Sequence, residues 1–190
     1  MKKIFLTVFF IILSTNLYAS NIKKVYFAGG CFWCMEESFD KVEGVIETIS
    51  GYSGGHVKNP KYKDVVKNTT GHYETLEITY DPSITNFEKL LEIFWVNIDP
   101  FDADGQFCDK GESYKSVVFY ENSDQKKIIE TSIKNIENKF NKKVVTYVKN
   151  FKEFYMAETY HQDYYEKNFI RYLMYKKGCQ REEVLNKIWG

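Results

Sequence analysis

The sequence lacks several of the features that identify whole classes of protein. Its 190 residues include only 3 prolines and 11 glycines and contain no sustained heptads, which excludes collagen-like, low-complexity and coiled-coil chains. Neither sign of charge predominates, because 26 Lys and Arg stand against 26 Asp and Glu. Without a net positive charge, the chain offers no field that would hold nucleic acid or an anionic membrane.

No apolar run is long enough to span a bilayer, which takes about 20 residues. The longest run covers residues 4–13, after Lys2 and Lys3, and a stretch of polar and small residues follows it. This order is typical of a bacterial secretory signal peptide, cleaved after Ala19 or Ser20. We therefore expect residues 1–20 to be removed and the mature protein to be exported without membrane insertion; an uncleaved anchor or a buried N-terminal helix is the alternative.

Aromatic residues are abundant, and 15 Tyr, 15 Phe and 3 Trp argue against disorder. No linker or repeat follows residue 20, so we expect a single domain over residues 21–190. Hydrophobic periodicity predicts strands at 22–28, 45–52, 72–80, 114–120 and 144–148, and helices at 31–41, 86–98, 123–140 and 154–167, with shorter helical patterns at 62–66 and in the tail 175–190. The first six main elements follow the order β-α-β-β-α-β, which predicts an α+β fold with a ferredoxin-like split βαβ core and a C-terminal extension.

The four cysteines are Cys31, Cys34, Cys108 and Cys179. An even number in an exported chain is compatible with a secreted binding domain that holds two structural disulfides. One close pair and two single cysteines fit redox chemistry at least as well. Cysteine count alone leaves both interpretations open.

Cys31 has the setting of a nucleophile. It follows a predicted strand and the Gly29-Gly30 turn, at the predicted start of a helix. The N-terminus of a helix favours a thiolate, which is the reactive form of cysteine. Cys31 and Cys34 form a C-x-x-C motif, so a general thiol–disulfide oxidoreductase is one hypothesis. That motif here follows the first mature strand, and no proline is placed to face the dithiol, which counts against a thioredoxin-like protein.

Two other functions, a cysteine protease and a zinc-binding protein, fit the sequence less well. His161 lies 130 residues after Cys31, a separation that papain-type proteases share, but the element order does not match their fold. A zinc site needs four ligands at suitable spacing, and one C-x-x-C with scattered Cys and His does not supply them. We therefore expect no metal.

Seven short motifs occur in one order across the mature chain: Gly30–Trp33, Gly51–Gly55, Asn59–Tyr62, Gly71–Glu74, Asn97–Pro100, Asp109–Gly111 before Tyr114, and Ala157–Tyr165. Together they resemble peptide methionine sulfoxide reductase A, the family that reduces the S-epimer of methionine sulfoxide, free or in proteins. The resemblance covers residues 25–180. It implies oxidoreductase chemistry that needs no metal, flavin or nucleotide cofactor.

The resemblance assigns a role to each matching residue: Cys31 as the nucleophile that becomes a sulfenic acid, Glu74 as the acid that protonates the sulfoxide oxygen, Tyr62 and Tyr114 as hydrogen-bond donors to that oxygen, Asp109 as a polar group lining the site, and Phe32 and Trp33 as the pocket for the S-methyl group. A sulfoxide oxygen leaves only when protonated, and a carboxyl group near aromatic rings can hold a proton near neutrality. His161 is expected to support the site through hydrogen bonds.

The resolving cysteine is less clearly marked. Cys179 follows Gly178 in the C-terminal tail, where the family often carries its recycling cysteine, and we expect it to condense with oxidised Cys31. Cys34 is the rival, because it stands where the family often has glycine and lies about one helical turn from Cys31. Cys108, next to Asp109, is the third candidate. A thioredoxin-like donor would then reduce the disulfide, which suits the periplasm.

Overall fold

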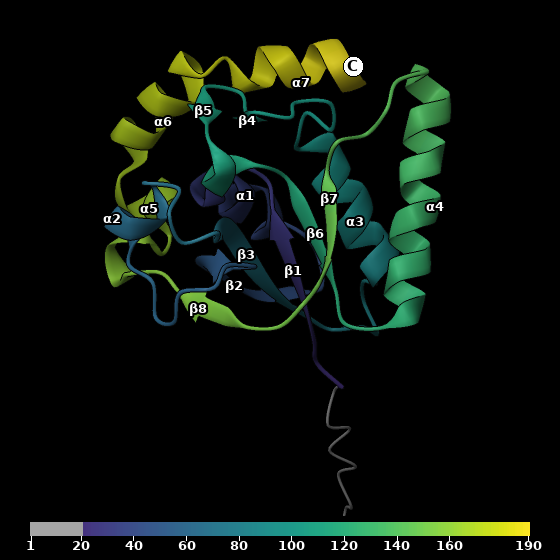
Figure 1. Cartoon of the computed structure of the whole chain (residues 1–190), viewed down its shortest axis with the longest axis horizontal. Helices are drawn as coiled ribbons and strands as arrows, with labels where there is room; N and C mark the ends of the chain where they lie inside the picture. The colour runs from purple at the N-terminus through teal and green to yellow at the C-terminus, as the bar shows by residue number, and fades with distance from the viewer. Residues whose placement is uncertain (1–20) are drawn as a thin grey trace, which may run out of the picture.

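The computed structural model describes residues 21–190, so the predicted signal peptide lies outside the described residues. A curled six-stranded sheet forms the centre of the molecule, in the order β7-β6-β1-β3-β2-β8 (Figure 1). Its strands are β1 (Lys23–Ala28), β2 (Val45–Ser53), β3 (Tyr73–Tyr80), β6 (Val117–Tyr120), β7 (Tyr147–Asn150) and β8 (Phe154–Met156). Two-residue strands β4 (Gly105–Gln106) and β5 (Asp109–Lys110) form a separate small hairpin.

The middle of the sheet is antiparallel. β1 pairs with β3 and with β6, and β2 pairs with β3. β6 and β7 are parallel neighbours. Every residue of β3 is buried, because this strand is covered on both faces. A polar side chain on β3 is therefore held away from water wherever it points.

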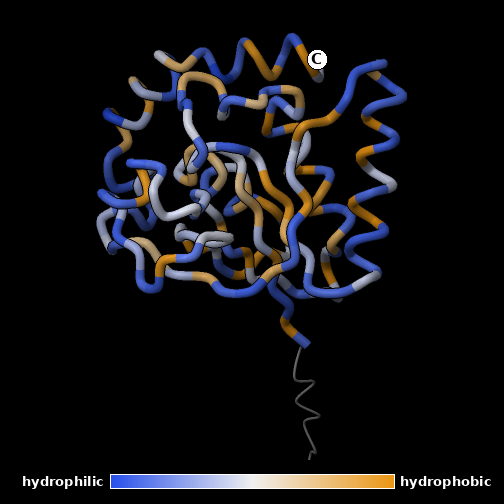
Figure 2. The backbone as a smooth tube through the Cα atoms, viewed as in Figure 1, coloured by the Kyte–Doolittle hydropathy of each residue, from blue (hydrophilic) through white to orange (hydrophobic). Residues whose placement is uncertain are grey.

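Three helices bury their apolar sides against one face of the sheet: α1 (Phe32–Phe39), α3 (Phe87–Val96) and α4 (Ser123–Phe140). The core there combines Phe27 of β1 and Ile78 of β3 with Phe39, Phe94 and Ile129 of the helices. Figure 2 shows hydrophobic residues concentrated in the central strands and hydrophilic ones along the outside of α4. The mixed α/β architecture predicted from the sequence is thus present.

Four further helices complete the described part of the chain. They are α2 (Tyr62–Val65), α5 (Tyr164–Lys167), α6 (Phe169–Gly178) and α7 (Arg181–Trp189), with two 3₁₀ turns, η1 (Glu112–Tyr114) and η2 (Thr159–His161). The C-terminal helix α7 is fixed to the core by Trp189, whose Nε1–H donates a 3.0 Å hydrogen bond to the Ile98 carbonyl. Among residues 21–190, no helix combines the length and apolar character that crossing a bilayer requires.

Three sequence predictions of elements need correction. The predicted strand 114–120 begins only at Val117, because Tyr114 lies in the 3₁₀ turn η1. The strand predicted at 144–148 is β7, which begins at Tyr147, where it first pairs with β6. The helix predicted at 154–167 is divided into β8, η2 and the short helix α5.

Long-range pairing explains the last difference. β8 joins the edge of the sheet beside β2, with Gly51 opposite Met156, and the Ala157 N–H donates to the Ser50 carbonyl. Gly51 permits this approach, since a Cβ there would lie 2.3 Å from the Phe154 ring. The aromatic pattern that resembles a helix in the sequence is used by a strand instead.

Candidate active site

Cys31 lies at the junction that the sequence predicted. It is the N-cap residue of α1, directly after β1, and its carbonyl accepts the Cys34 N–H at 3.1 Å. Gly30 makes the preceding turn with φ +80°, and a Cβ there would lie 2.5 Å from Gln106 Cβ, so this position needs glycine. Cys31 is 5% exposed and Cys34 2% exposed, and both are free thiols.

The two thiols share a hydrogen bond, and burial and this bond together shift the pKa of each. Burial raises the pKa of Cys31 well above its ordinary value. The hydrogen bond from Cys31 lowers the pKa of Cys34 to about 7, although burial opposes this shift. The sequence predicts a Cys31 thiolate at the helix N-terminus, whereas burial disfavours that thiolate and the hydrogen bond makes Cys34 the more acidic thiol of the pair.

The carboxyl group of Glu74 lies against the first turn of α1. It projects from β3, is 2% exposed, and its Oε2 accepts the Phe32 N–H at 3.1 Å. Burial raises the pKa of Glu74 well above its ordinary value, even though the bond from Phe32 opposes that shift. Burial thus favours the protonated form of this carboxyl group, which is the form that can give up a proton.

Tyr62 and Tyr114 meet at the same place from different elements. Their hydroxyls hydrogen-bond to one another, and the nearby Glu74 carboxyl group contributes to raising the pKa of both. Burial raises the pKa of Tyr62 to about 12 and also raises the pKa of Tyr114, so both keep their protons. The short helix α2 is held there by Glu158, whose carboxylate accepts the Tyr62 N–H at 3.0 Å and the Tyr52 O–H at 2.9 Å.

Asp109 reaches the site from β5. Its carboxylate accepts the Tyr175 O–H of α6. Burial raises the pKa of Asp109, and its charge acts in turn on Cys31 and Glu74. The structure thus brings together all five residues to which the sequence assigned catalytic roles: Cys31, Tyr62, Glu74, Asp109 and Tyr114.

The two aromatic residues after Cys31 differ in exposure. Phe32 is buried, whereas Trp33 is half-buried and stacks on the Tyr164 ring with 3.8 Å between ring centroids. Trp33 Nε1–H donates to His161 Nδ1 at 3.2 Å. Because that nitrogen accepts, the His161 proton resides on Nε2, and burial lowers the pKa of His161 to about 4. His161 is thus a neutral support for Trp33, as the sequence predicts.

The other two cysteines are joined to each other. Cys108, beside the small hairpin, forms a disulfide with Cys179 at the end of α6. The alternative of a binding domain with two structural disulfides is excluded in this structure, because Cys31 and Cys34 are both free. Cys179 ends an ordered helix and is already bonded, so in this state it has no thiol to offer Cys31. Cys34 does.

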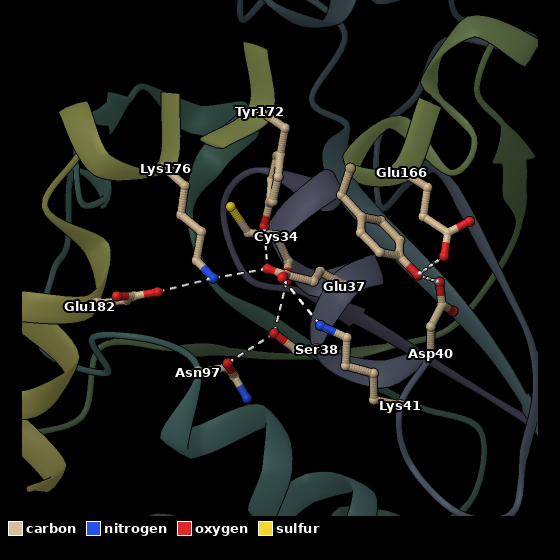
Figure 3. Close-up of polar contacts among 11 residues, drawn as sticks. Cys34, Glu37, Ser38, Asp40, Lys41, Asn97, Glu166, Tyr172, Lys176 and Glu182 are labelled. Carbon is tan, nitrogen blue, oxygen red and sulfur yellow. Dashed lines mark hydrogen bonds and ion pairs between the residues drawn. The ribbon is translucent and has the colours of Figure 1, made fainter. Parts of the chain in front are cut away.

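The surroundings of Cys34 were missed by sequence reasoning. Figure 3 shows the Tyr172 hydroxyl beside the Cys34 sulfur, and this hydroxyl donates to Glu37 Oε2 at 2.6 Å. Lys176 also donates to Glu37, at 2.9 Å. The high density of tyrosines from residue 160 to 175 was the available signal, but their partners on α1 are more than 100 residues away in the sequence.

Comparisons with known proteins agree with this geometry. A family model described as peptide methionine sulfoxide reductase matches residues 23–190. The chain is 47% identical over 165 residues to peptide methionine sulfoxide reductase MsrA 2 of Staphylococcus aureus (strain MW2), covering 86% of this chain and 93% of that protein. It is 48% identical over 166 residues to MsrA of Bacillus licheniformis, covering 86% and 92%.

Solved structures show the same fold. Mxr1 from Saccharomyces cerevisiae in reduced form matches with a TM-score of 0.72 and 29% identity, covering 77% of this chain and 86% of that chain. Mxr1 in complex with Trx2 matches with a TM-score of 0.51 and 20% identity, covering 75% and 84%.

Proposed function

The chain belongs to the peptide methionine sulfoxide reductase family and reduces methionine sulfoxide, and we propose that Cys31 takes the oxygen while Cys34 resolves the oxidised product. The observation that carries this proposal is the position of the buried Glu74 carboxyl group, which accepts the N–H of Phe32 in the first turn of the helix after Cys31 and whose pKa burial raises. A nucleophile and a neutral acid side by side are what a sulfoxide requires, since its oxygen departs only after protonation.

In the first step, the Cys31 sulfur attacks the sulfoxide sulfur. The Cys31 proton passes to Cys34, to which it is already hydrogen-bonded. Glu74 gives its proton to the sulfoxide oxygen, which Tyr62 and Tyr114 hold by hydrogen bonds. The oxygen is transferred to Cys31 as a sulfenic acid, and the sulfur of methionine leaves as a thioether. Methionine is thereby reduced and Cys31 oxidised.

In the second step, Cys34 attacks the Cys31 sulfur. An S–S bond forms, the S–O bond breaks, and the oxygen leaves as water with the proton that Cys34 releases. Cys34 is one turn from Cys31 and in hydrogen-bond contact with it, whereas Cys179 is bonded to Cys108. This favours Cys34 over Cys179, the residue that the sequence pattern favoured.

A thioredoxin-like protein is the proposed electron donor. A dithiol donor restores Cys31 and Cys34 by disulfide exchange. The support comes from yeast Mxr1, which has been solved in complex with Trx2. The exposed Cys108 makes the second disulfide accessible to the same donor.

The proposed substrate is the S-epimer of methionine sulfoxide, free or within proteins. Phe32 and Trp33 would form the pocket for the methyl group. Tyr62 and Tyr114 would hydrogen-bond to the oxygen, and Cys31 would attack the sulfur. When the methyl group, the oxygen and the sulfur of a chiral sulfoxide are each held in a fixed position, only one epimer can bind productively. The test is reduction of the separate epimers with dithiothreitol as reductant. We expect turnover of the S-epimer alone; equal rates on both epimers would contradict the arrangement.

We further propose that residues 1–20 are a signal peptide and that residues 21–190 act as one reductase domain in the periplasm. The support is the match of the family model from residue 23 onward and the charged, apolar and small-residue pattern before it. The order β6-β1-β3-β2, with α1 and α3 in one core cluster, supports a ferredoxin-like centre for that domain.

A further inference from the structure

Arg181, the first residue of α7, is a buried cation. It is 4% exposed, and its guanidinium donates to the carbonyl of Asn97 at the C-terminal end of α3. The same group lies 3.6 Å from Met35 Sδ and 4.4 Å above the centre of the Phe107 ring. One side chain thus joins the C-terminal helix to α1, to α3 and to the loop between β4 and β5.

No carboxylate among residues 21–190 forms an ion pair with Arg181. Buried charges are ordinarily paired, because removing an ion from water is costly. The positive charge acts instead on Cys34 and on Asp109, and it lowers the pKa of each. Met35, which the guanidinium touches, is the residue directly after Cys34. The negative charge that Arg181 balances is therefore that of Cys34 and Asp109, next to Cys31.

Several other groups face Cys34. They are Cys31 on the same helix, Tyr172 and Tyr175 on α6, Asp109 on β5 and Glu74 on β3. Beyond Tyr172 lie Glu37 and Lys176, which pair with each other, and Arg181, which forms no ion pair among residues 21–190, is the cation whose charge lowers the pKa of Cys34. The Cys31 thiol lowers the pKa of Cys34 only while Cys31 is reduced, and that thiol no longer exists once Cys31 carries oxygen. The favourable charge of Arg181 is present in both states.

We propose that Arg181 is a positioning residue for the second step, whose buried guanidinium holds Cys34 as a thiolate when the sulfenic acid stands on Cys31. This inference rests on the proposed function and deepens it. Cys34 gives up the proton that it received in the first step, its thiolate forms the S–S bond, the Cys31 S–O bond breaks, and the oxygen leaves as water with that proton. Arg181 neither gains nor loses a proton, and its effect is electrostatic.

The experiment follows a single turnover of the full-length protein with one equivalent of methionine S-sulfoxide between pH 5.5 and pH 9. Methionine release reports the first step. Dimedone trapping and mass spectrometry report the sulfenic acid and the Cys31–Cys34 disulfide. We expect Arg181→Met to slow disulfide formation about tenfold at pH 7 and to raise its pH midpoint by about one unit. The rate should recover by pH 9, where Cys34 ionises without help.

Two variants serve as controls. Arg171→Met removes an exposed arginine from α6 and should leave the pH midpoint unchanged. Arg181→Lys keeps the charge, so its midpoint should stay within about half a unit of the unmodified protein. If Arg181→Met does not fold, Arg181→Lys alone decides, since a shift of a full unit with the charge retained would overturn the proposal.

An unshifted midpoint in Arg181→Met, or a loss of rate that is the same at pH 9 as at pH 7, would also overturn it, because a purely structural role predicts no rescue by pH. Failure of the proposed function looks different. The unmodified protein would then release no methionine, or would form a disulfide between Cys31 and Cys179.

Discussion

The N–H of Phe32 donates a hydrogen bond to the carboxyl group of Glu74 at 3.1 Å. Phe32 directly follows Cys31, so this bond couples the position of the acid on β3 to that of the nucleophile at the start of α1. The two reacting groups come from separate elements, 43 positions apart in the sequence, yet one short backbone contact fixes their relation.

Glu74→Gln should depress the chemical step far more than substrate binding. Glutamine can still accept the Phe32 N–H, but it has no acidic proton for the sulfoxide oxygen. General acid catalysis contributes roughly 10²–10⁴-fold, so kcat should fall on that scale while KM changes by a few-fold. Glu77→Gln on the same strand, where the carboxylate pairs with Lys24, is the matched control. A change in KM alone would remove the acid role from Glu74.

The same substitution should stabilise the protein in a pH-dependent way. In the folded protein burial raises the pKa of Glu74 well above its ordinary value, whereas in the unfolded chain the carboxyl group ionises above about pH 4.3. Stability is therefore full at low pH and is lost as pH rises toward the folded pKa. In urea unfolding, the advantage of Glu74→Gln should grow from pH 4 to pH 8. A difference that is constant with pH would contradict the buried neutral acid.

Glu37 should show the opposite dependence. Burial would raise its pKa, but hydrogen bonds from Tyr172 and Lys176 outweigh burial and lower it to about 2. The stabilisation is present above the unfolded pKa of about 4.3 and is lost as pH falls toward 2. Glu37→Gln should thus be less stable than the unmodified protein at pH 6, and the gap should close below pH 3. Glu43→Gln, at an exposed carboxylate, controls for removal of one charge.

Cys34→Ser should separate the two chemical steps. The variant should release about one methionine per enzyme, because that step needs Cys31, and then stop with thioredoxin as donor. Cys179→Ser should continue to turn over, since Cys34 is free to resolve Cys31. Mass spectrometry after one equivalent of substrate should find Cys31 joined to Cys34. A Cys34→Ser enzyme with full thioredoxin-dependent turnover would return the resolving role to Cys179.

Local pattern was enough for the parts of the fold in which one helix or strand face decides the structure. The helix predicted at 123–140 coincides with α4, because its apolar residues repeat with helical spacing above one core. The position of Cys31 followed from a strand, two glycines and a helix start. Those signals are contained within about ten residues.

Contacts between residues far apart in the sequence determine the features of the structure that the local sequence pattern did not predict. The pairing of Cys179 with Cys108 spans 71 positions and depends on where α6 meets the small hairpin. Arg181 lies in a polar helix, which ordinarily indicates surface, yet its side chain is directed into the core toward Asn97. The strand β8 exists because Gly51 leaves room for Phe154. None of these relations has a local signature.

The central claim is that the Cys31 sulfur takes the oxygen from the substrate. The most direct measurement is a single-turnover assay that counts methionine released per enzyme, with folding checked by circular dichroism. A variant in which Cys34, Cys108 and Cys179 are all serine should release about one methionine and yield a dimedone adduct on Cys31, whereas Cys31→Ser should release none. Release of methionine by folded Cys31→Ser at the rate of the unmodified protein would contradict the account.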